Sequence, residues 1–128
     1  MLFVMLFVAA KASAPATNAL TILQAEGINP YRQLIFAIGM VEGNCDTLAY
    51  NPAEQATGFF QVRPIRLLDY NRRTGSNYTL ADMYDYHKAE QVFMYYARDG
   101  TLNYERIARA WNGSGPKTIE YWNKVKKF

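Results

Sequence analysis

The chain has 128 residues and a mass of 14.7 kDa, which fits one domain with or without a leader and excludes a large α/β barrel or a two-domain dinucleotide enzyme. Half of the residues are hydrophobic and 20% are charged, as in a globular protein and unlike a disordered or collagen-like one. Fourteen Lys and Arg against 11 acidic residues give a formal charge of +3, which is mildly basic and gives no reason to predict nucleic-acid binding.

The first residues have the pattern of a leader. Residues 2–10 are all apolar, and Ala12-Ser13-Ala14 follows as a small-residue cleavage pattern. This run is too short for a membrane span, which needs about 20 residues, and is typical of a secretory signal peptide. We predict a signal peptide over residues 1–14, a folded domain over 15–128, no stable membrane span, and export to the periplasm or the extracellular space. A buried N-terminal strand is the alternative.

Signals that start and stop helices are frequent from residue 29 onward. Asn29-Pro30 is typical of a helix start, and the apolar residues between Leu34 and Val41 then fall on one face. Glu42-Gly43 predicts the end of this helix. The stretch from Asn44 to Gln61 is the least regular part of the chain and allows a short hairpin.

A second helix is predicted to open at Arg63-Pro64, to carry Ile65, Leu67 and Leu68, and to close before Gly75. Thr79–Asp82 resembles a capping box with Asp in place of Glu.

Three further helices follow from the same reasoning. An apolar stripe over residues 86–96 ends at Gly100, a short helix over 104–111 breaks at 112–116, and a last helix covers about 117–127. The predicted fold class is therefore mainly α, with α+β possible through a small hairpin.

Glu42 is the first candidate for chemistry. It directly follows the apolar face of its helix, so its carboxyl should be partly desolvated and should lie near the negative end of the helix dipole. Both effects raise a carboxyl pKa, and a raised pKa is what a general acid needs at neutral pH. The plain alternative is a surface glutamate at a helix end.

Two more segments carry groups that a ligand can use. In Gly58–Pro64 the glycine permits close backbone approach, and Gln61 offers both a donor and an acceptor. In Ala110–Gly113 the amide of Asn112 is suited to a substrate carbonyl or hydroxyl. Taken alone, the first segment also reads as a helix-capping loop and the second as a helix stop.

Together these segments resemble, in order and spacing, the lytic transglycosylase (SLT-type) domain of the goose-type lysozyme-like superfamily. Val41–Gly43 is similar to that family's catalytic Glu followed by Ser. Gly58–Pro64 is similar to its Gly-Leu-Met-Gln followed by Pro, and Ala110–Gly115 to its Ala-Tyr-Asn-Ala-Gly. Thr118–Val125 is similar to its Thr-x-x-Tyr-Val-x-x-Val. The resemblance runs over residues 31–125.

The resemblance implies a lysozyme-like single domain with a substrate cleft. It implies cleavage of the β-1,4 bond between N-acetylmuramic acid and N-acetylglucosamine in peptidoglycan strands, with Glu42 as the single catalytic acid and base and a 1,6-anhydro product. It implies a monomer without a cofactor. The substrate-binding residues that we carry over are Gln61, Asn112, Tyr121, Phe60 and Trp111.

Two other functions stay open. If Asp46 or Glu54 faces Glu42 across a water, the protein is a lysozyme-type hydrolase. The second open function is a non-catalytic peptidoglycan-binding or structural module of the same fold, because Gly43 stands where the family usually has Ser. With one histidine and one cysteine in the chain, we predict no metal site.

Overall fold

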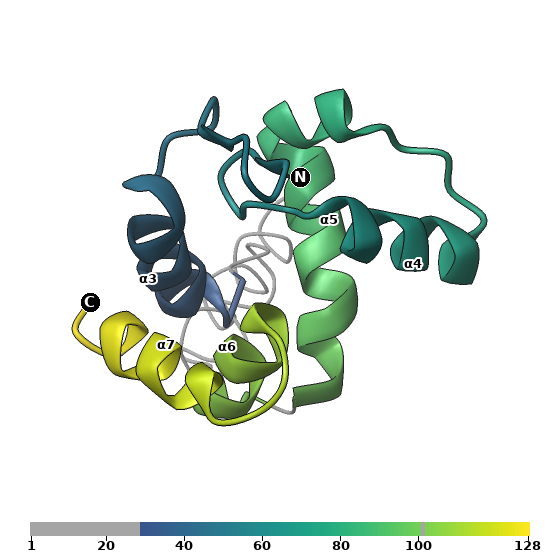
Figure 1. The fold of residues 1–128 in the computed structure, drawn as a ribbon. Helices are drawn as coiled ribbons and strands as arrows, with labels where there is room; N and C mark the ends of the chain where they lie inside the picture. The colour runs from purple at the N-terminus through teal and green to yellow at the C-terminus, as the bar shows by residue number, and fades with distance from the viewer. Residues whose placement is uncertain (1–28, 101) are drawn as a thin grey trace, which may run out of the picture. The chain divides into compact units, whose positions relative to one another are not determined.

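The computed structural model describes residues 29–100 and 102–128. Residues 31–128 form one unit. The leader predicted over residues 1–14 lies outside the described residues. The described part is mainly α-helical with one small antiparallel hairpin, which confirms the predicted fold class (Figure 1). No helix in this part is both long and apolar enough to cross a membrane.

Helix α3 (Arg32–Gly43) begins later than the sequence predicts. Pro30 and Tyr31 form a turn, and the Tyr31 carbonyl accepts the hydrogen bond from the amide of Ile35 at 2.8 Å. The predicted start at Asn29-Pro30 is therefore two residues too early. The end is as predicted, because α3 stops at Gly43 and the next residue adopts a left-handed conformation. Its buried face is made of Leu34, Ile35, Ala37, Ile38 and Gly39.

The irregular stretch after α3 contains the hairpin that the sequence allows. Strand β1 (Tyr50–Asn51) pairs antiparallel with β2 (Ala56–Thr57), with Tyr50 opposite Thr57. Most of the other residues in this stretch form turns, and several of them have a left-handed backbone conformation. Four residues other than glycine have a positive φ there: Asn44, Cys45, Gln55 and Gln61.

Helix α4 (Pro64–Thr74) starts at the predicted proline and ends before Gly75. Of its three predicted apolar residues only Leu67 is buried, whereas Ile65 and Leu68 are 77% and 57% exposed. The capping box predicted over Thr79–Asp82 is present and opens a short 3₁₀ turn, η2 (Leu80–Tyr84).

Helix α5 (Tyr86–Ala97) runs through the centre of the helical part and continues into a 3₁₀ turn, η3 (Arg98–Gly100). Helices α6 (Tyr104–Asn112) and α7 (Lys117–Val125) pack on one another and on α3 (Figure 1). All three helices lie close to their predicted ranges. The core between them is aromatic, since Phe60 stacks on Phe93 with ring centroids 4.9 Å apart and Trp111 meets Phe93 edge-on.

Two glycines let the turn after β2 come close to its neighbours. A Cβ on Gly39 would lie 2.3 Å from the ring of Phe59, so the ring packs directly on the backbone of α3. Gly58 has a φ of 81°, and a Cβ there would lie 2.0 Å from the carbonyl oxygen of Met83. No other residue fits at either position without movement, and the turn is therefore fixed between α3 and η2.

Candidate active site

A cleft of about 350 Å³ opens where the end of α3, the turn after β2, the first half of α4 and the end of α6 meet. Its volume lies within the range of small-molecule sites, about 300–1,000 Å³. Three of the four segments named from the sequence thus contribute to one cavity. The residues that line it are Glu42, Gln61, Arg63, Ile65, Arg66, Asp69, Trp111, Asn112 and Gly113.

Glu42 lies in the last turn of α3, largely shielded by its surroundings yet still at the cleft wall. Burial raises the pKa of its carboxyl from 4.5 to about 7. The nearby Tyr121 hydroxyl and Arg63 guanidinium lower this pKa, and the Glu54 carboxylate raises it. Protonated and ionised forms of Glu42 therefore coexist near neutral pH, and the group can both give and take a proton.

Tyr121, on α7, lies beside Glu42. Its side chain is 7% exposed, and its buried hydroxyl finds no partner of full hydrogen-bond geometry among the described residues. The Glu42 carboxyl is nevertheless close enough that each group shifts the pKa of the other. Burial holds the pKa of Tyr121 far above its usual value, so the phenol keeps its proton. It can donate to the Glu42 carboxylate. Tyr121 is not among the residues that line the cleft, so this predicted substrate contact reaches the site only through Glu42.

Gln61 reaches the cleft from the tight turn after β2. Its backbone is left-handed, and its amide nitrogen Nε2 donates to the carbonyls of Ala49 and Gly58 at 3.1 and 3.0 Å. These bonds fix the orientation of the side-chain amide. No donor in the described part of the chain bonds to its Oε1, so this oxygen is the atom that Gln61 can offer to a ligand.

The end of α6 supplies the opposite wall. Trp111 is buried, and its indole Nε1 donates to the carbonyl of Phe60 at 3.2 Å. Asn112 is half-buried at the last position of the helix and lines the cleft. Its backbone carbonyl accepts a bond of 3.2 Å from Nη1 of Arg63. The side-chain amide of Asn112 thus lies beside a fixed backbone.

Phe60 is a predicted substrate contact that the structure does not bring to the cleft. Its side chain is 0% exposed and packs against Phe93, Trp111 and Tyr86. A fully buried ring has no surface to offer to a ligand. Phe60 acts instead through its carbonyl, which holds the indole of Trp111.

Sequence reasoning treated Arg63 as a helix start and missed Arg66 and Asp69, although all three line the cleft. The Arg66 guanidinium lies 4.5 Å from the ring centroid of Tyr96 and 4.9 Å from that of Trp111. Asp69 accepts a bond of 2.6 Å from the Tyr96 hydroxyl. The available signal was the spacing of three residues, which puts Arg66 and Asp69 on one side of α4, with Arg63 directly ahead of that helix.

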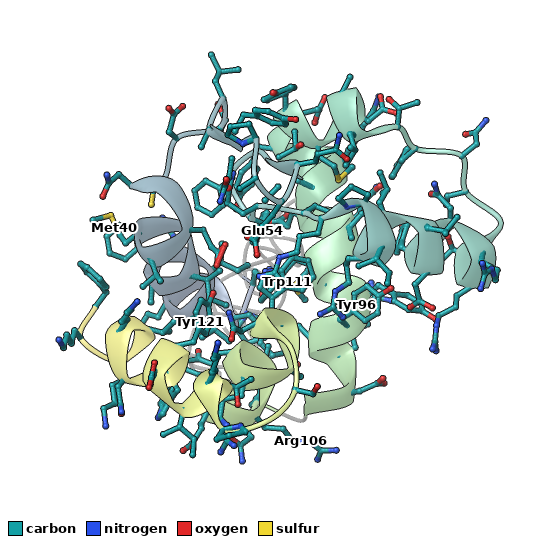
Figure 2. All side chains as sticks on the ribbon, viewed as in Figure 1. Met40, Glu54, Tyr96, Arg106, Trp111 and Tyr121 are labelled. Atoms are coloured by element: carbon teal, nitrogen blue, oxygen red, sulfur yellow. The ribbon has the colours of Figure 1, made fainter. Side chains whose placement is uncertain are left out.

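Asp46 and Glu54, the two candidates for a second catalytic carboxylate, differ in position. Asp46 accepts a bond of 2.9 Å from the amide of Leu48, which stabilises its own loop. Glu54 pairs with Arg63, with Oε2 and Nε 3.7 Å apart, and acts on the pKa of Glu42. Figure 2 shows Glu54, Trp111 and Tyr121 directed into the same region between α3 and α6. Of the two carboxylates, Glu54 is the one whose charge acts on Glu42.

The residue after Glu42 is tightly packed. A Cβ on Gly43 would lie 2.9 Å from the Cβ of Ala49, so the serine common at this position in the resembled family would have to displace the loop before β1. The local backbone therefore suits glycine.

Cys45 and His87 lie apart from the cleft lining. The Cys45 thiol donates to the carbonyl of Phe36 at 3.7 Å, and His87 is exposed at the start of α5. Within residues 29–100 and 102–128, no group of three or more His, Cys, Asp or Glu side chains is placed to hold a metal ion.

Comparison with known proteins gives no relative: no family model, no curated protein and no solved structure matches the chain.

Proposed function

We propose that this protein cleaves peptidoglycan as a lytic transglycosylase, with Glu42 as its single catalytic acid and base. The observation that carries the proposal is one shielded carboxyl, with its pKa raised to about 7, in the wall of a cleft that two amide side chains also line. A carboxyl in this state suits a residue that must first donate a proton and later accept one. The motif resemblance adds the class of substrate.

In the proposed reaction, protonated Glu42 gives its proton to the oxygen that links N-acetylmuramic acid to N-acetylglucosamine. The bond from muramic acid C1 to that oxygen breaks, and the substrate's own N-acetyl group stabilises the positive charge that develops at C1. The Glu42 carboxylate then takes the proton of the C6 hydroxyl as O6 bonds to C1. The products are a free sugar hydroxyl and a 1,6-anhydro end, and Glu42 returns to its protonated form.

The neighbours of Glu42 suit these steps. The Tyr121 phenol can donate to the carboxylate after the first proton transfer and so stabilise the form that acts as base. Oε1 of Gln61 and the amide of Asn112 can bind hydroxyl and acetamido groups of the sugar. No step needs a cofactor. The proposed partner is a peptidoglycan strand, taken by a monomer outside the cytoplasm.

A hydrolase is the second candidate, and the position of Glu54 favours it. If Glu54 activated a water on the face of the sugar opposite Glu42, the product would be a reducing end. Against this, Glu54 is already paired with Arg63.

Digestion of purified peptidoglycan, with mass analysis of the products, tests the proposal. We expect anhydro ends from the unaltered protein and a loss of at least about 10²–10⁴-fold in Glu42→Gln, which keeps the size of the side chain but cannot deliver the proton. Asp46→Asn is the matched control and should keep most activity, as should Glu54→Gln. Reducing ends together with loss of activity in Glu54→Gln would make the protein a hydrolase. No cleavage by the unaltered protein would favour a binding module.

A further inference from the structure

Arg63 touches three parts of the candidate site. Its Nε lies 3.7 Å from Oε2 of Glu54 in the hairpin turn, and its Nη1 donates to the carbonyl of Asn112 at 3.2 Å. It also lines the cleft together with Glu42. One guanidinium therefore joins the hairpin to the end of α6 and places a fixed positive charge close to the proposed acid.

We propose that Arg63 is a positioning residue of this site, which orients the end of α6 through the Asn112 carbonyl and sets the charge that surrounds Glu42. The proposal rests on the function proposed above and adds to it a residue that no motif assigns.

The geometry separates two effects of the side chain. The first is a tether, because one rigid guanidinium presents Nε to Glu54 and Nη1 to the Asn112 carbonyl at the same time. The second is a charge, because any cation at this place favours the ionised form of Glu42. A lysine keeps the charge and loses the fork, whereas a glutamine loses the charge.

Three polar groups from three different segments face Glu42: the Tyr121 hydroxyl from α7, the Arg63 guanidinium ahead of α4, and the Glu54 carboxylate from the hairpin turn. The guanidinium lowers the pKa of Glu42, and the Glu54 carboxylate raises it. Removal of either charge should therefore move the titration of Glu42, in opposite directions.

The test measures the titration of Glu42 directly. Carbon-13 NMR of the full chain, labelled at the glutamate side-chain carboxyls, follows the Glu42 resonance with pH, and Glu42→Gln assigns this resonance by its absence. The variants are Arg63→Gln, Arg63→Lys and Glu54→Gln. Arg106→Gln is the matched control, because Arg106 is exposed on α6 and Figure 2 shows it well away from Glu54 and Trp111. The dependence of kcat/KM on pH is measured on the same proteins with peptidoglycan.

We expect Arg63→Gln to raise the pKa of Glu42, Glu54→Gln to lower it, and Arg106→Gln to leave it unchanged. Arg63→Lys should titrate as the unaltered protein does. It should nevertheless lose about tenfold in kcat/KM, mainly through KM, because the tether to Asn112 is gone. In every variant, the pH at which kcat/KM falls on the alkaline side should shift in the same direction as the pKa of Glu42 measured by NMR.

Two results separate this inference from the proposed function. If the unaltered protein cleaves peptidoglycan but Arg63→Gln titrates like Arg106→Gln, the role of Arg63 is wrong and the proposed function stands. If no protein in the series cleaves peptidoglycan but Glu42 shifts as expected, the proposed function is wrong and the electrostatic role of Arg63 stands. Equal kcat/KM in Arg63→Lys and the unaltered enzyme would overturn the tether.

Discussion

Glu42 is expected to change its protonation in the pH range where most proteins are most stable. Its carboxyl ionises with a pKa near 4.5 when the chain is unfolded and near 7 in the folded protein, because folding removes much of its water. Between these two values the folded state binds more protons than the unfolded state. The same environment that suits Glu42 for proton transfer therefore costs stability whenever the group is ionised.

We predict that the free energy of unfolding decreases as pH rises from about 4.5 to about 7, on account of this group. The contribution is fully present below 4.5 and is lost above 7, and its size is on the order of 3 kcal/mol. Glu42→Gln has no charge to bury, so its stability relative to the unaltered protein should increase with pH. Urea unfolding of both proteins across this range measures the difference. A difference that does not change with pH would contradict the prediction.

The place of Glu42 could be predicted from the sequence because it depends on local information, an apolar helix face and a glycine stop. The pairing of Glu54 with Arg63 and the burial of Phe60 depend on tertiary packing. The residue pattern at 58–61 does not say which of two adjacent aromatic rings faces the core. The structure places both rings in the interior, and only Gln61 of that turn reaches the cleft.

The segment between α3 and α4 carries the most constrained backbone of the site. It contains four non-glycine residues with a positive φ, and Gln61 is one of them. Such conformations cost free energy and persist where the surrounding contacts hold them. Here the Phe59 ring against Gly39 and the Gly58 amide, which donates to the Ala49 carbonyl at 2.8 Å, supply those contacts.

We predict that Gly39→Ala destabilises the protein by about 2–3 kcal/mol, because the new methyl group overlaps the Phe59 ring. Thermal unfolding should show a fall in Tm of roughly 10 °C or more. Gly75→Ala is the comparison, since a Cβ there meets nothing within 4 Å and the cost is that of a left-handed alanine alone, about 1 kcal/mol. Equal losses in the two variants would show that the Phe59 contact is not what fixes the turn.

The sequence predicts where the helices lie better than it predicts what each helix contributes to the site. Proline and glycine mark both ends of α4, and the capping box at Thr79–Asp82 marks η2, because these signals act over a few residues. The start of α3 differs from the prediction, since Asn29-Pro30 has the composition of a helix start but Pro30 and Tyr31 form a turn. Left-handed backbone at Cys45 or Gln55 has no comparable local signal.

Across the described part, α5 joins elements that are far apart in the sequence, because it contacts η2, α4 and α6. The buried ring of Phe93 on α5 contacts Phe60, which follows β2, and Trp111, which lies near the end of α6. The turn after β2 and the end of α6 are therefore positioned by packing on the same helix. Apolar periodicity predicts that such a helix exists and which face is buried. It does not predict which helices pair, because pairing is decided by the shapes of facing side chains.

Helix α4 differs from the rest in how little of it is covered. Only Leu67 and Tyr70 of its 11 residues are buried, and Figure 1 shows it leading away from α5 toward the loop before η2. In hydrogen-exchange terms, its backbone amides should exchange through local opening, well before the global unfolding that exposes α5. Mass-detected deuterium uptake should therefore rank α4 as less protected than α3 and α5. Equal protection would contradict this.

A ligand bound in the cleft is expected to change which helices take up deuterium fastest. Because Arg63 and Arg66 join α4 to the end of α6 at the cleft, a glycan fragment bound against them should slow deuterium uptake in α4 and leave the last turn of α7 unaffected. The part of the cleft formed by α4 would then open and close as a cooperative unit of its own, while α3, which holds Glu42, stays folded.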